Sequence, residues 1–496
     1  MPEGVQVPQP AVAARRTLVL AACLMATFMA AVESTIIATA IPTIVGDLGG
    51  FSLFSWVFTI YLLTQAVSIP VYGRLADIYG RRTIFFCGAG LFLAGSTLCG
   101  FAGSMVALIC FRALQGFGAG AVQPIAATIL GDIYTPTERG KVQGIVSSVF
   151  GVSAVVGPSL GAFLIQHLSW PVVFWVNLPI GIAAIVMIAL FLQETVQHRQ
   201  HRIDWLGSLL LLIAVGALML ALVQGNSLGR PVLAGSIAVG VVALAALLLH
   251  ERFTTEPMLP LELWRLRVIV VGSLGNGTAG AVMMGVSAFL PTYVQGAMGR
   301  TPVAGGLVLG AMSVSWALSS IFGARIMART SYRLVAVLGG LCLFGGCLIL
   351  VALTPADGPA WASLGSLVIG IGMGFTSTVF IVSVQACVPW RQRGAATSST
   401  MFLRFIGQSI GVATCGAVLN ATMVAIDPTA AHAVDRLLDA TGRAAMLPAE
   451  LAHLTDVVAR SLHNAYLLAS VFAFATLLIA TRLPARLSPA QQTRLD

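Results

Sequence analysis

The sequence predicts an all-α membrane protein with fourteen transmembrane helices. Its 496 residues are 57% hydrophobic and only 9% charged, with a mean hydropathy of +0.93. Fourteen apolar stretches are each long enough to cross a hydrocarbon core ~30 Å thick, which needs about 20 helical residues. The short segments between these stretches place most of the arginines on one side of the membrane. These three observations together indicate a polytopic membrane protein.

The helices are expected in three groups along the chain. The first six lie at 17–41, 52–72, 84–103, 105–131, 141–165 and 171–192. The next two, at 205–223 and 232–250, contain no embedded charge, and polar segments near 193–204 and 250–267 bracket them. The last six lie at 268–294, 303–326, 334–353, 361–387, 394–424 and 462–481. We therefore expect two six-helix halves, residues 1–192 and 268–496, joined by an inserted pair of helices within 193–267.

The basic residues predict how the helices are oriented. With the N-terminus inside, twenty of the 27 Lys and Arg residues fall in inner segments and five in outer segments, while Arg112 and Arg404 fall inside predicted helices. The positive-inside rule then places both termini in the cytoplasm, with the protein in the inner or plasma membrane. The net charge of +9 comes from these topological anchors and does not indicate nucleic-acid binding.

One outer segment, 425–461, is much longer than a simple connection requires. It carries apolar residues at helical spacing, including Val434, Leu437, Leu454 and Val458, among Asp and Arg residues. This pattern predicts one or two short surface helices lying on the membrane. The segment is either a lid-like connector or a binding element.

Cysteine usage and missing motifs exclude several kinds of site. All eight cysteines fall within predicted helices, without the spacing of a disulfide framework or a metal site. The sequence has no GxxxxGK[ST] loop, so an ion gradient rather than ATP is the expected driving force. It has no HExxH motif and no embedded cluster of acids or histidines, which argues against a membrane-embedded enzyme. No cofactor or metal is expected.

Glu33 is the one acidic residue deep inside a predicted helix, and such a residue is treated as functional because burying a charge is costly. Glu33 lies about eight residues before the outer end of its helix, and Arg112 about eight after the outer start of its own, so both lie ~12 Å below the outer surface. Burial favours the protonated carboxyl and a nearby arginine favours the ionised one. A movement that changes their separation would therefore control protonation, whereas the alternative is a static structural ion pair.

The loop between the second and third helices reads GRLADIYGRR at 73–82. It contains two glycines that permit a tight turn and three charged residues near a helix end: Gly73, Gly80, Asp77, Arg81 and Arg82. This pattern resembles the signature of the major facilitator superfamily, G-x-L-x-D-R-x-G-R-[RK], with Ile78 in place of the usual basic residue.

The resemblance implies a major facilitator fold and a latch between its two halves on the cytoplasmic side. Asp77 is implied to face the N-terminal end of the helix at 394–424, and Arg81 to bridge towards Asp132, contacts that a helix dipole favours. The second half has only a trace of the motif, GARIMART at 323–330, which contains no acid.

Further stretches resemble other motifs of this family: residues 111–120 resemble its Arg-bearing helix 4 motif, residues 151–162 resemble the helix 5 motif associated with exporters that antiport, and the rest resemble the fourteen-helix drug:proton antiporter subfamily. They are AVESTIIATAIP at 31–42, FRALQGFGAG at 111–120, GVSAVVGPSLGA at 151–162, WPVVFWVNLPIG at 170–181, DWLG at 204–207 and PMLPLELWR at 257–265. The sequence departs from the usual subfamily pattern at Glu33, where Asp is usual, and at Ala162, which replaces a second glycine. In the third stretch, Pro158 removes a backbone hydrogen bond and is expected to bend the helix. Gly157 and Gly161 leave little side-chain bulk there, and the resemblance implies a seal between the halves.

Arg404 lies ten residues past Gly394, ~15 Å into its predicted helix. The second half offers no embedded acid to neutralise it, so it either snorkels towards the cytoplasm or faces a central cavity. In the cavity it would meet Glu33, a substrate anion or a lipid headgroup. Other polar and aromatic residues expected to line this cavity are Gln65, Gln115, Asn276, Phe289, Trp316, Phe375, Gln385 and Gln408.

The resemblance implies a monomeric transporter of the multidrug-efflux type. It would export hydrophobic or amphipathic small molecules in exchange for protons, by alternating access of two halves around a midplane site. The expected partners are a small-molecule or lipid-like substrate, protons and membrane lipids. Two alternatives stay open: an exporter of an endogenous lipid, siderophore or secondary metabolite, and a sensor that no longer transports.

Overall fold

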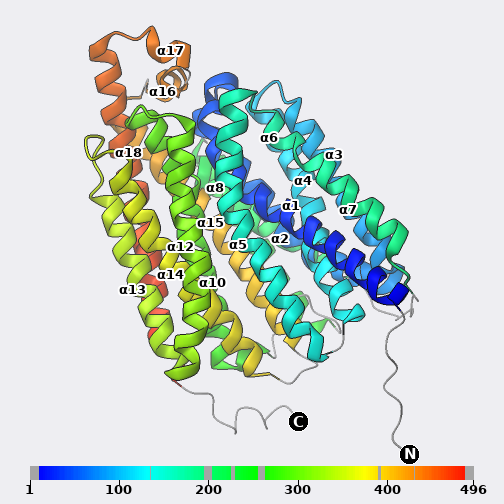
Figure 1. Cartoon of the computed structure of the whole chain (residues 1–496). Helices are drawn as coiled ribbons and strands as arrows, with labels where there is room; N and C mark the ends of the chain where they lie inside the picture. Colours follow the sequence, from blue (N-terminus) through cyan, green and yellow to red (C-terminus); the bar gives the residue numbers. More distant parts are fainter. Residues whose placement is uncertain are drawn as a thin grey trace, which may run out of the picture.

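A computed structural model describes residues 10–134, 136–194, 204–224, 229–254, 263–388, 393–428, 430–438 and 440–485. Every regular element in these residues is a helix, as predicted (Figure 1). The N-terminal group comprises α1 (Pro10–Leu48), η1 (Phe51–Leu53), α2 (Phe54–Tyr79), α3 (Arg81–Gly100), α4 (Met105–Ile133), α5 (Pro136–His167), α6 (Val172–Trp175) and α7 (Asn177–Phe191). The pair that follows is α8 (Trp205–Gln224) and α9 (Arg230–Phe253). The C-terminal group comprises η2 (Leu263–Arg265), α10 (Arg267–Ser287), α11 (Leu290–Thr292), η3 (Tyr293–Ala297), α12 (Pro302–Arg329), α13 (Tyr332–Val351), α14 (Gly358–Ala386), α15 (Arg393–Ile426), α16 (Ala430–Leu438), α17 (Ala440–Ala444) and α18 (Pro448–Thr481).

The helix lengths match a membrane-spanning architecture. Within the described residues, thirteen helical stretches are long and apolar enough to cross a bilayer. α5 is a continuous helix of 32 residues, or ~48 Å at 1.5 Å per residue, and is long enough for a further crossing. The prediction of an all-α membrane fold is therefore confirmed.

The predicted span at 268–294 is present, as Arg267–Ala297, but it is not one regular α-helix. α10 ends at Ser287, and the chain continues through the short α11 into a π-helical turn, η3. Pro291 accounts for the break, because it has no N–H to donate to the carbonyl of Ser287, four residues earlier.

The predicted last helix, 462–481, is also wrong at its start. α18 begins at Pro448 and runs for 34 residues, so residues 448–461 belong to it and not to a loop. The first half of α18 buries Leu454, Val457 and Val458, at the spacing of one helical face.

The rest of the long segment forms a compact cap, defined here as α16 and α17. Val434 and Leu437 on α16 are 0% and 1% exposed, and α16 packs against α1, η1 and α18. The expectation that these apolar residues lie on the membrane is therefore wrong: they face the protein. Both membrane and protein offer an apolar surface, so the spacing in the sequence could not distinguish them.

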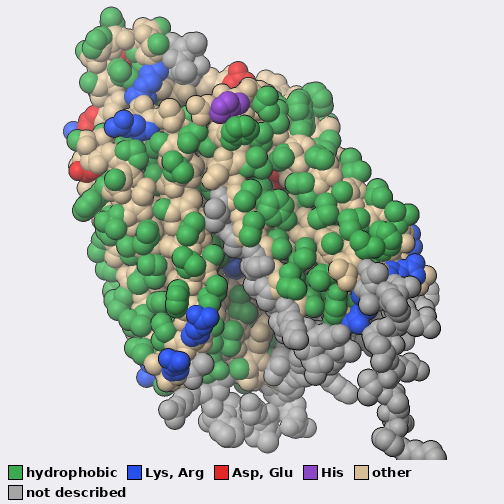
Figure 2. All heavy atoms as spheres, in the orientation of Figure 1, with side chains coloured by type: hydrophobic (Ala, Val, Ile, Leu, Met, Phe, Trp, Pro, Cys, Tyr) green, Lys and Arg blue, Asp and Glu red, His purple; other side chains and the backbone are tan. Residues whose placement is uncertain are grey.

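Two sets of helices lie on either side of a central seam. In the N-terminal group α1 packs against α5 and α7, and α4 against α2 and α3; in the C-terminal group α14 packs against α12 and α13, and α10 against α15 and α18. Across the seam α5 packs against α12 and α2 against α15, while α8 contacts both α2 and α15. Figure 2 shows a hollow between the two groups on the lower part of this face.

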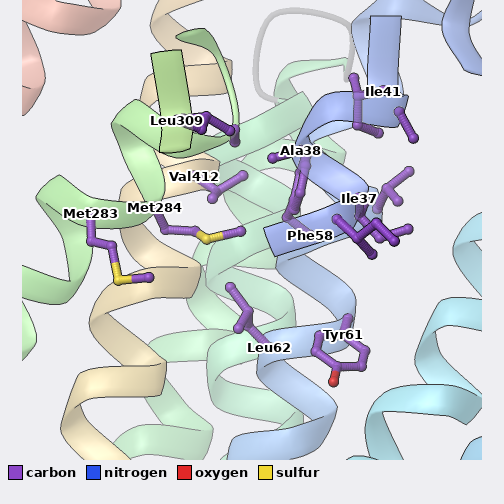
Figure 3. Packing of buried hydrophobic residues seen from close by; sticks show 14 of the residues in the cluster. Ile37, Ala38, Ile41, Phe58, Tyr61, Leu62, Met283, Met284, Leu309 and Val412 are labelled. Carbon is purple, nitrogen blue, oxygen red and sulfur yellow. The ribbon is translucent and has the colours of Figure 1, made fainter. Parts of the chain in front are cut away.

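The two ends of the seam differ. The described chain begins and ends at the same face, called the base here, and the cap lies at the opposite end (Figure 1). Near the cap, Phe54 of α2 meets Phe289 edge to face, with ring centroids 5.2 Å apart. In the middle of the seam, side chains of α1 and α2 face those of α10, α12 and α15, among them Ala38, Leu309 and Val412 (Figure 3). Apolar packing thus closes the seam above the hollow.

Candidate functional site

The centre of the N-terminal group holds a buried ion pair. Glu33 of α1 and Arg112 of α4 contact each other through carboxylate Oε1 and guanidinium Nη1, and their side chains are 0% and 1% exposed. The matched depth expected from the sequence therefore corresponds to a direct contact. Two charges removed from water in this way need further hydrogen bonds to be stable.

Neighbouring helices provide those hydrogen bonds. The amide of Asn177, the first residue of α7, donates to Glu33 Oε2 at 2.5 Å. Arg112 donates to the carbonyl of Val57 at 3.1 Å and to Gln115 Oε1 at 2.6 Å. Its guanidinium carbon also lies 4.0 Å from the centre of the Tyr61 ring. The pair is therefore held from α1, α2, α4 and α7.

A second layer connects these groups to each other. Ser96 Oγ of α3 accepts from Gln115 Nε2 at 3.0 Å and from Asn177 Nδ2 at 3.1 Å, and donates to the carbonyl of Phe174 at 2.9 Å. Gln115 was expected to line the substrate cavity, but its side chain is used within this network. Asn177 and Ser96 were missed, although an amide within the apolar run of 171–192 was a readable signal.

This arrangement determines what the carboxyl can do. Ionised, Glu33 satisfies Arg112 and Asn177; protonated, it no longer neutralises the guanidinium, which then has only neutral oxygens as acceptors. Because the pair has almost no exposed surface, proton exchange with water requires another conformation.

The loop at the base contains a tight turn and an ion pair. Gly80 joins α2 to α3 with φ +90°, a conformation that L-residues with a side chain rarely adopt. Arg81 Nε lies 2.8 Å from Asp132 Oδ2, which ties α3 to α4. Glu194 accepts the backbone N–H groups of Arg81 at 2.7 Å and Arg82 at 3.0 Å, and so caps the start of α3.

The described latch contacts all lie within the N-terminal group. Glu194 was not predicted, since its contact depends on a loop folding back on the turn. Gly73 lies in α2 with open space around it. The side chain of Asp77, from which a contact with the second half is expected, lies outside the described residues.

The expected seal in α5 packs against helices of both groups. An added Cβ on Gly161 would lie 2.8 Å from Ile36 Cγ1 and 3.0 Å from the Ile36 carbonyl oxygen, and one on Gly157 would meet Thr35, so both glycines let α5 approach α1 closely. On the other side, the carbonyl oxygen of Pro158 lies 2.8 Å from the position of a Cβ on Gly306 of α12. Pro158 does not end the helix, which is continuous from Pro136 to His167.

A pocket lies in the seam next to this packing. Its lining comes from α1, α5, α10 and α12 and is predominantly apolar: Thr35, Ala38, Pro158, Met283, Met284, Ser287, Leu309, Met312, Ser313 and Trp316. α1 therefore presents Glu33 to one side and pocket residues to the other.

Arg404 of α15 lies beside this pocket. Its guanidinium carbon is 5.2 Å from the centre of the Trp316 ring, and its Nη2 is 3.9 Å from the sulfur of Met283. Gln408, one turn further along α15, contacts the same sulfur at 3.6 Å. Arg404 thus points towards α10 and α12.

The other residues expected in the cavity have different surroundings. Gln65 is 3% exposed on α2, and Asn276 is 1% exposed on α10. Phe289 packs on Phe54 near the cap. Phe375 packs against Gly323 and Gly339, and Gln385 Nε2 donates to Thr397 Oγ1 at 3.1 Å. These residues do not line the pocket. The sequence could not show this, because one sequence does not reveal which face of a helix points inward. Within the described residues, no group of three or more His, Cys, Asp or Glu side chains could hold a metal ion.

Known proteins place this chain in a family. A family model for the Major Facilitator Superfamily matches residues 23–412. The multidrug transporter protein MdtP of Bacillus subtilis is 34% identical over 410 residues, covering 82% of this chain and 76% of that protein. Multidrug resistance protein 3 of the same organism is 34% identical over 401 residues, covering 80% and 78%.

The fold is also shared with solved transporters. A bacterial homologue of the human lysosomal transporter Spinster, in an inward-facing and unoccupied conformation, has a TM-score of 0.69 at 18% identity, covering 97% of this chain and 100% of that one. A D-xylose–proton symporter has a TM-score of 0.65 at 14% identity, covering 95% and 98%. The fourteen-helix pattern, the signature loop and these similarities agree: the chain is a multi-pass membrane transporter of the Major Facilitator Superfamily.

Proposed function

We propose that this protein exports hydrophobic or amphipathic small molecules in exchange for protons. The observation that carries the proposal is the Glu33–Arg112 pair, a carboxylate with 0% exposed side chain in the membrane-spanning part of the chain. Burying an ionisable group at this depth is costly, so its presence supports a role in transport. The names of the two Bacillus relatives support small-molecule efflux as the type of transport.

α1 provides a physical route for the coupling. Thr35 and Ala38 line the pocket within two turns of Glu33 on the same helix. Protonation of Glu33 removes its attraction to Arg112, and the resulting shift of α1 alters the pocket. Conversely, a substrate that displaces α1 changes the stability of the ion pair. Coupling of this kind needs only one helix that both sites contact.

Alternating access would occur between units 1–192 and 268–496, with 193–267 as the inserted part between them. The contacts of α8 with α2 and α15 support such a position for the inserted pair. The excess of arginine in segments on one side supports an orientation with both termini in the cytoplasm, and therefore with the hollow of Figure 2 facing inward. We propose that the transporter works as a monomer.

The test is efflux from proteoliposomes with an imposed pH gradient, using a panel of neutral, cationic and anionic amphiphiles. Glu33→Gln should abolish gradient-driven uphill transport but retain substrate binding and downhill exchange, because the amide cannot release a proton. A matched control is Glu450→Gln, which removes a carboxylate in the first turn of α18, a helix outside the four that hold the pair. Uphill transport by Glu33→Gln at the parent rate would exclude the proposed coupling.

A further inference from the structure

Arg404 is an embedded cation without an acidic partner in the part of the chain that the structure describes. No described carboxylate lies within 4.0 Å of its guanidinium. Among the described residues its guanidinium contacts the face of Trp316 and the sulfur of Met283, which are both weak partners for a full charge. Its side chain is partly exposed, so an anion entering the seam can reach it.

The other embedded arginine has a different environment. Arg112 is 1% exposed and is matched by Glu33, Gln115 and the Val57 carbonyl. Its charge is neutralised within the N-terminal group and is not available to a substrate in the seam. Among the described side chains that contact the pocket residues, Arg404 therefore supplies the uncompensated charge.

An apolar surface adjoins this cation. Trp316 and Met283 each contact Arg404 and also line the pocket, whose remaining lining includes Met284, Leu309 and Met312. A ligand with a charged head at Arg404 would have its tail next to unbranched, adaptable methionine side chains. This continuity between charge and apolar surface matches an amphiphile.

The pocket also contains a polar group with no partner of its own. Ser287 lines the pocket and is 6% exposed, and its hydroxyl has no hydrogen-bond partner among the described residues. A buried hydroxyl left in this way costs free energy that a ligand oxygen would recover. Ser287 lies one turn beyond Met283 on the same face of α10.

We infer that the preferred substrates are amphipathic anions: molecules with one carboxylate, sulfonate or phosphate head bound by Arg404 and an apolar tail against the methionines that line the pocket. The pocket has a free volume of ≈ 20 Å³ in this conformation and must widen as the seam opens to admit the tail. This inference rests on the proposed export function and narrows its substrate class. It also excludes quaternary ammonium compounds as preferred substrates, because a bare cation would approach an unneutralised arginine.

Binding to the purified full-length protein in phosphatidylcholine nanodiscs tests this directly. Three dansyl probes share one undecyl chain and differ only in the head: a carboxylate, a primary amide and a trimethylammonium. The carboxylate probe should bind at least about tenfold more tightly than the other two, as expected for a charge-assisted contact. Arg404→Gln should abolish this preference and leave amide binding within about twofold, and Arg404→Lys should retain most of it.

The control is Arg325→Gln, which removes an arginine from the same α12 that carries Trp316. Arg325 is exposed and packs over the exposed Phe322, so its loss should leave all three affinities unchanged. Amide binding reports whether each variant is folded. Adding phosphatidylglycerol to the nanodiscs distinguishes two natural sources of the anionic head. Displacement of the carboxylate probe by this lipid indicates that the site takes an acidic lipid, and unchanged probe affinity indicates a soluble amphiphile. Both results support an anion site.

The inference is overturned if the carboxylate probe binds no more tightly than the amide probe, or if Arg404→Gln leaves the preference intact. Failure of the proposed function gives a different pattern in proteoliposomes. Arg404-dependent binding without gradient-driven movement of any probe would retain the anion site and remove proton coupling. Gradient-driven movement of the trimethylammonium probe in preference to the carboxylate would retain coupling and remove the anion site.

Discussion

The carboxylate of Asp435 accepts the backbone N–H of Gly50 at 3.1 Å, although 385 residues separate them in the chain. It also accepts the N–H of Phe51 at 3.0 Å. Arg443 of the cap bonds to η3: its guanidinium donates to the carbonyls of Gln295 at 3.3 Å and Gly296 at 2.8 Å. The cap therefore joins the N-terminal group to the rest of the C-terminal group at one end of the seam, and if that end opens while the cap stays on η3, the two Asp435 bonds must break.

Asp435→Ala should shift the protein towards conformations open at the cap end, since two hydrogen bonds to an ionised group are lost. Each such bond contributes ~1.5–3 kcal/mol, and a change of about 1.4 kcal/mol alters an equilibrium tenfold. The rate at which a Met283→Cys reporter is labelled from the cap side should therefore rise at least about tenfold. The exposed native cysteines Cys87 and Cys110 are replaced first. Asp456→Ala, which breaks an exposed pair with Arg460 on α18, is the control. Equal labelling rates in parent and Asp435→Ala would show that the cap does not hold this end closed.

Asn177→Leu should weaken proton-coupled transport without preventing folding. The amide donates to Glu33 and to Ser96, so its loss destabilises the ionised carboxylate relative to the protonated one. The pH profile of efflux should therefore move upward. Asn464→Leu is the control, because Asn464 bonds Thr422 at an exposed position. A profile that shifts downward, or not at all, would contradict the assigned role of the amide.

Glu194→Ala should lower the thermal stability of the protein. Glu194 accepts two N–H groups at the start of α3, where the helix dipole favours an anion. Loss of these two hydrogen bonds is expected to lower the free energy of unfolding by ~1 kcal/mol. Unfolding in detergent, followed by differential scanning fluorimetry, measures the change. Glu194→Gln keeps one acceptor oxygen and should lose less; a larger loss for Gln than for Ala would exclude capping as the cause.

The membrane helices were predictable because hydropathy alone identifies a span that must satisfy its own backbone. Prediction failed where polar residues interrupt a helix or where an apolar residue has two possible partners. Asp456 and Arg460 hid the first half of α18, and Val434 suited a membrane surface as well as a protein one. Glu33 and Arg112 could be matched by depth, since the rise of a helix is fixed. Asn177 could not, because which helix face meets Glu33 depends on tertiary packing.

Gly161→Ala should destabilise the packing of α5 on α1. The added methyl carbon would overlap Thr39 Oγ1, and it would lie 2.8 Å from Ile36 Cγ1 and 3.0 Å from the Ile36 carbonyl oxygen, closer than van der Waals contact permits. The helices must separate, with an expected loss of ~1–3 kcal/mol in stability, and α5 must also shift against Gly306 on α12. Gly90→Ala in α3 is the matched control, because nothing lies within 4 Å of its added Cβ and alanine favours a helix over glycine. The thermal unfolding temperature and the rate of gradient-driven efflux should both fall for Gly161→Ala and stay at the parent values for Gly90→Ala. Equal behaviour of the two variants would mean that close approach at Gly161 is not required.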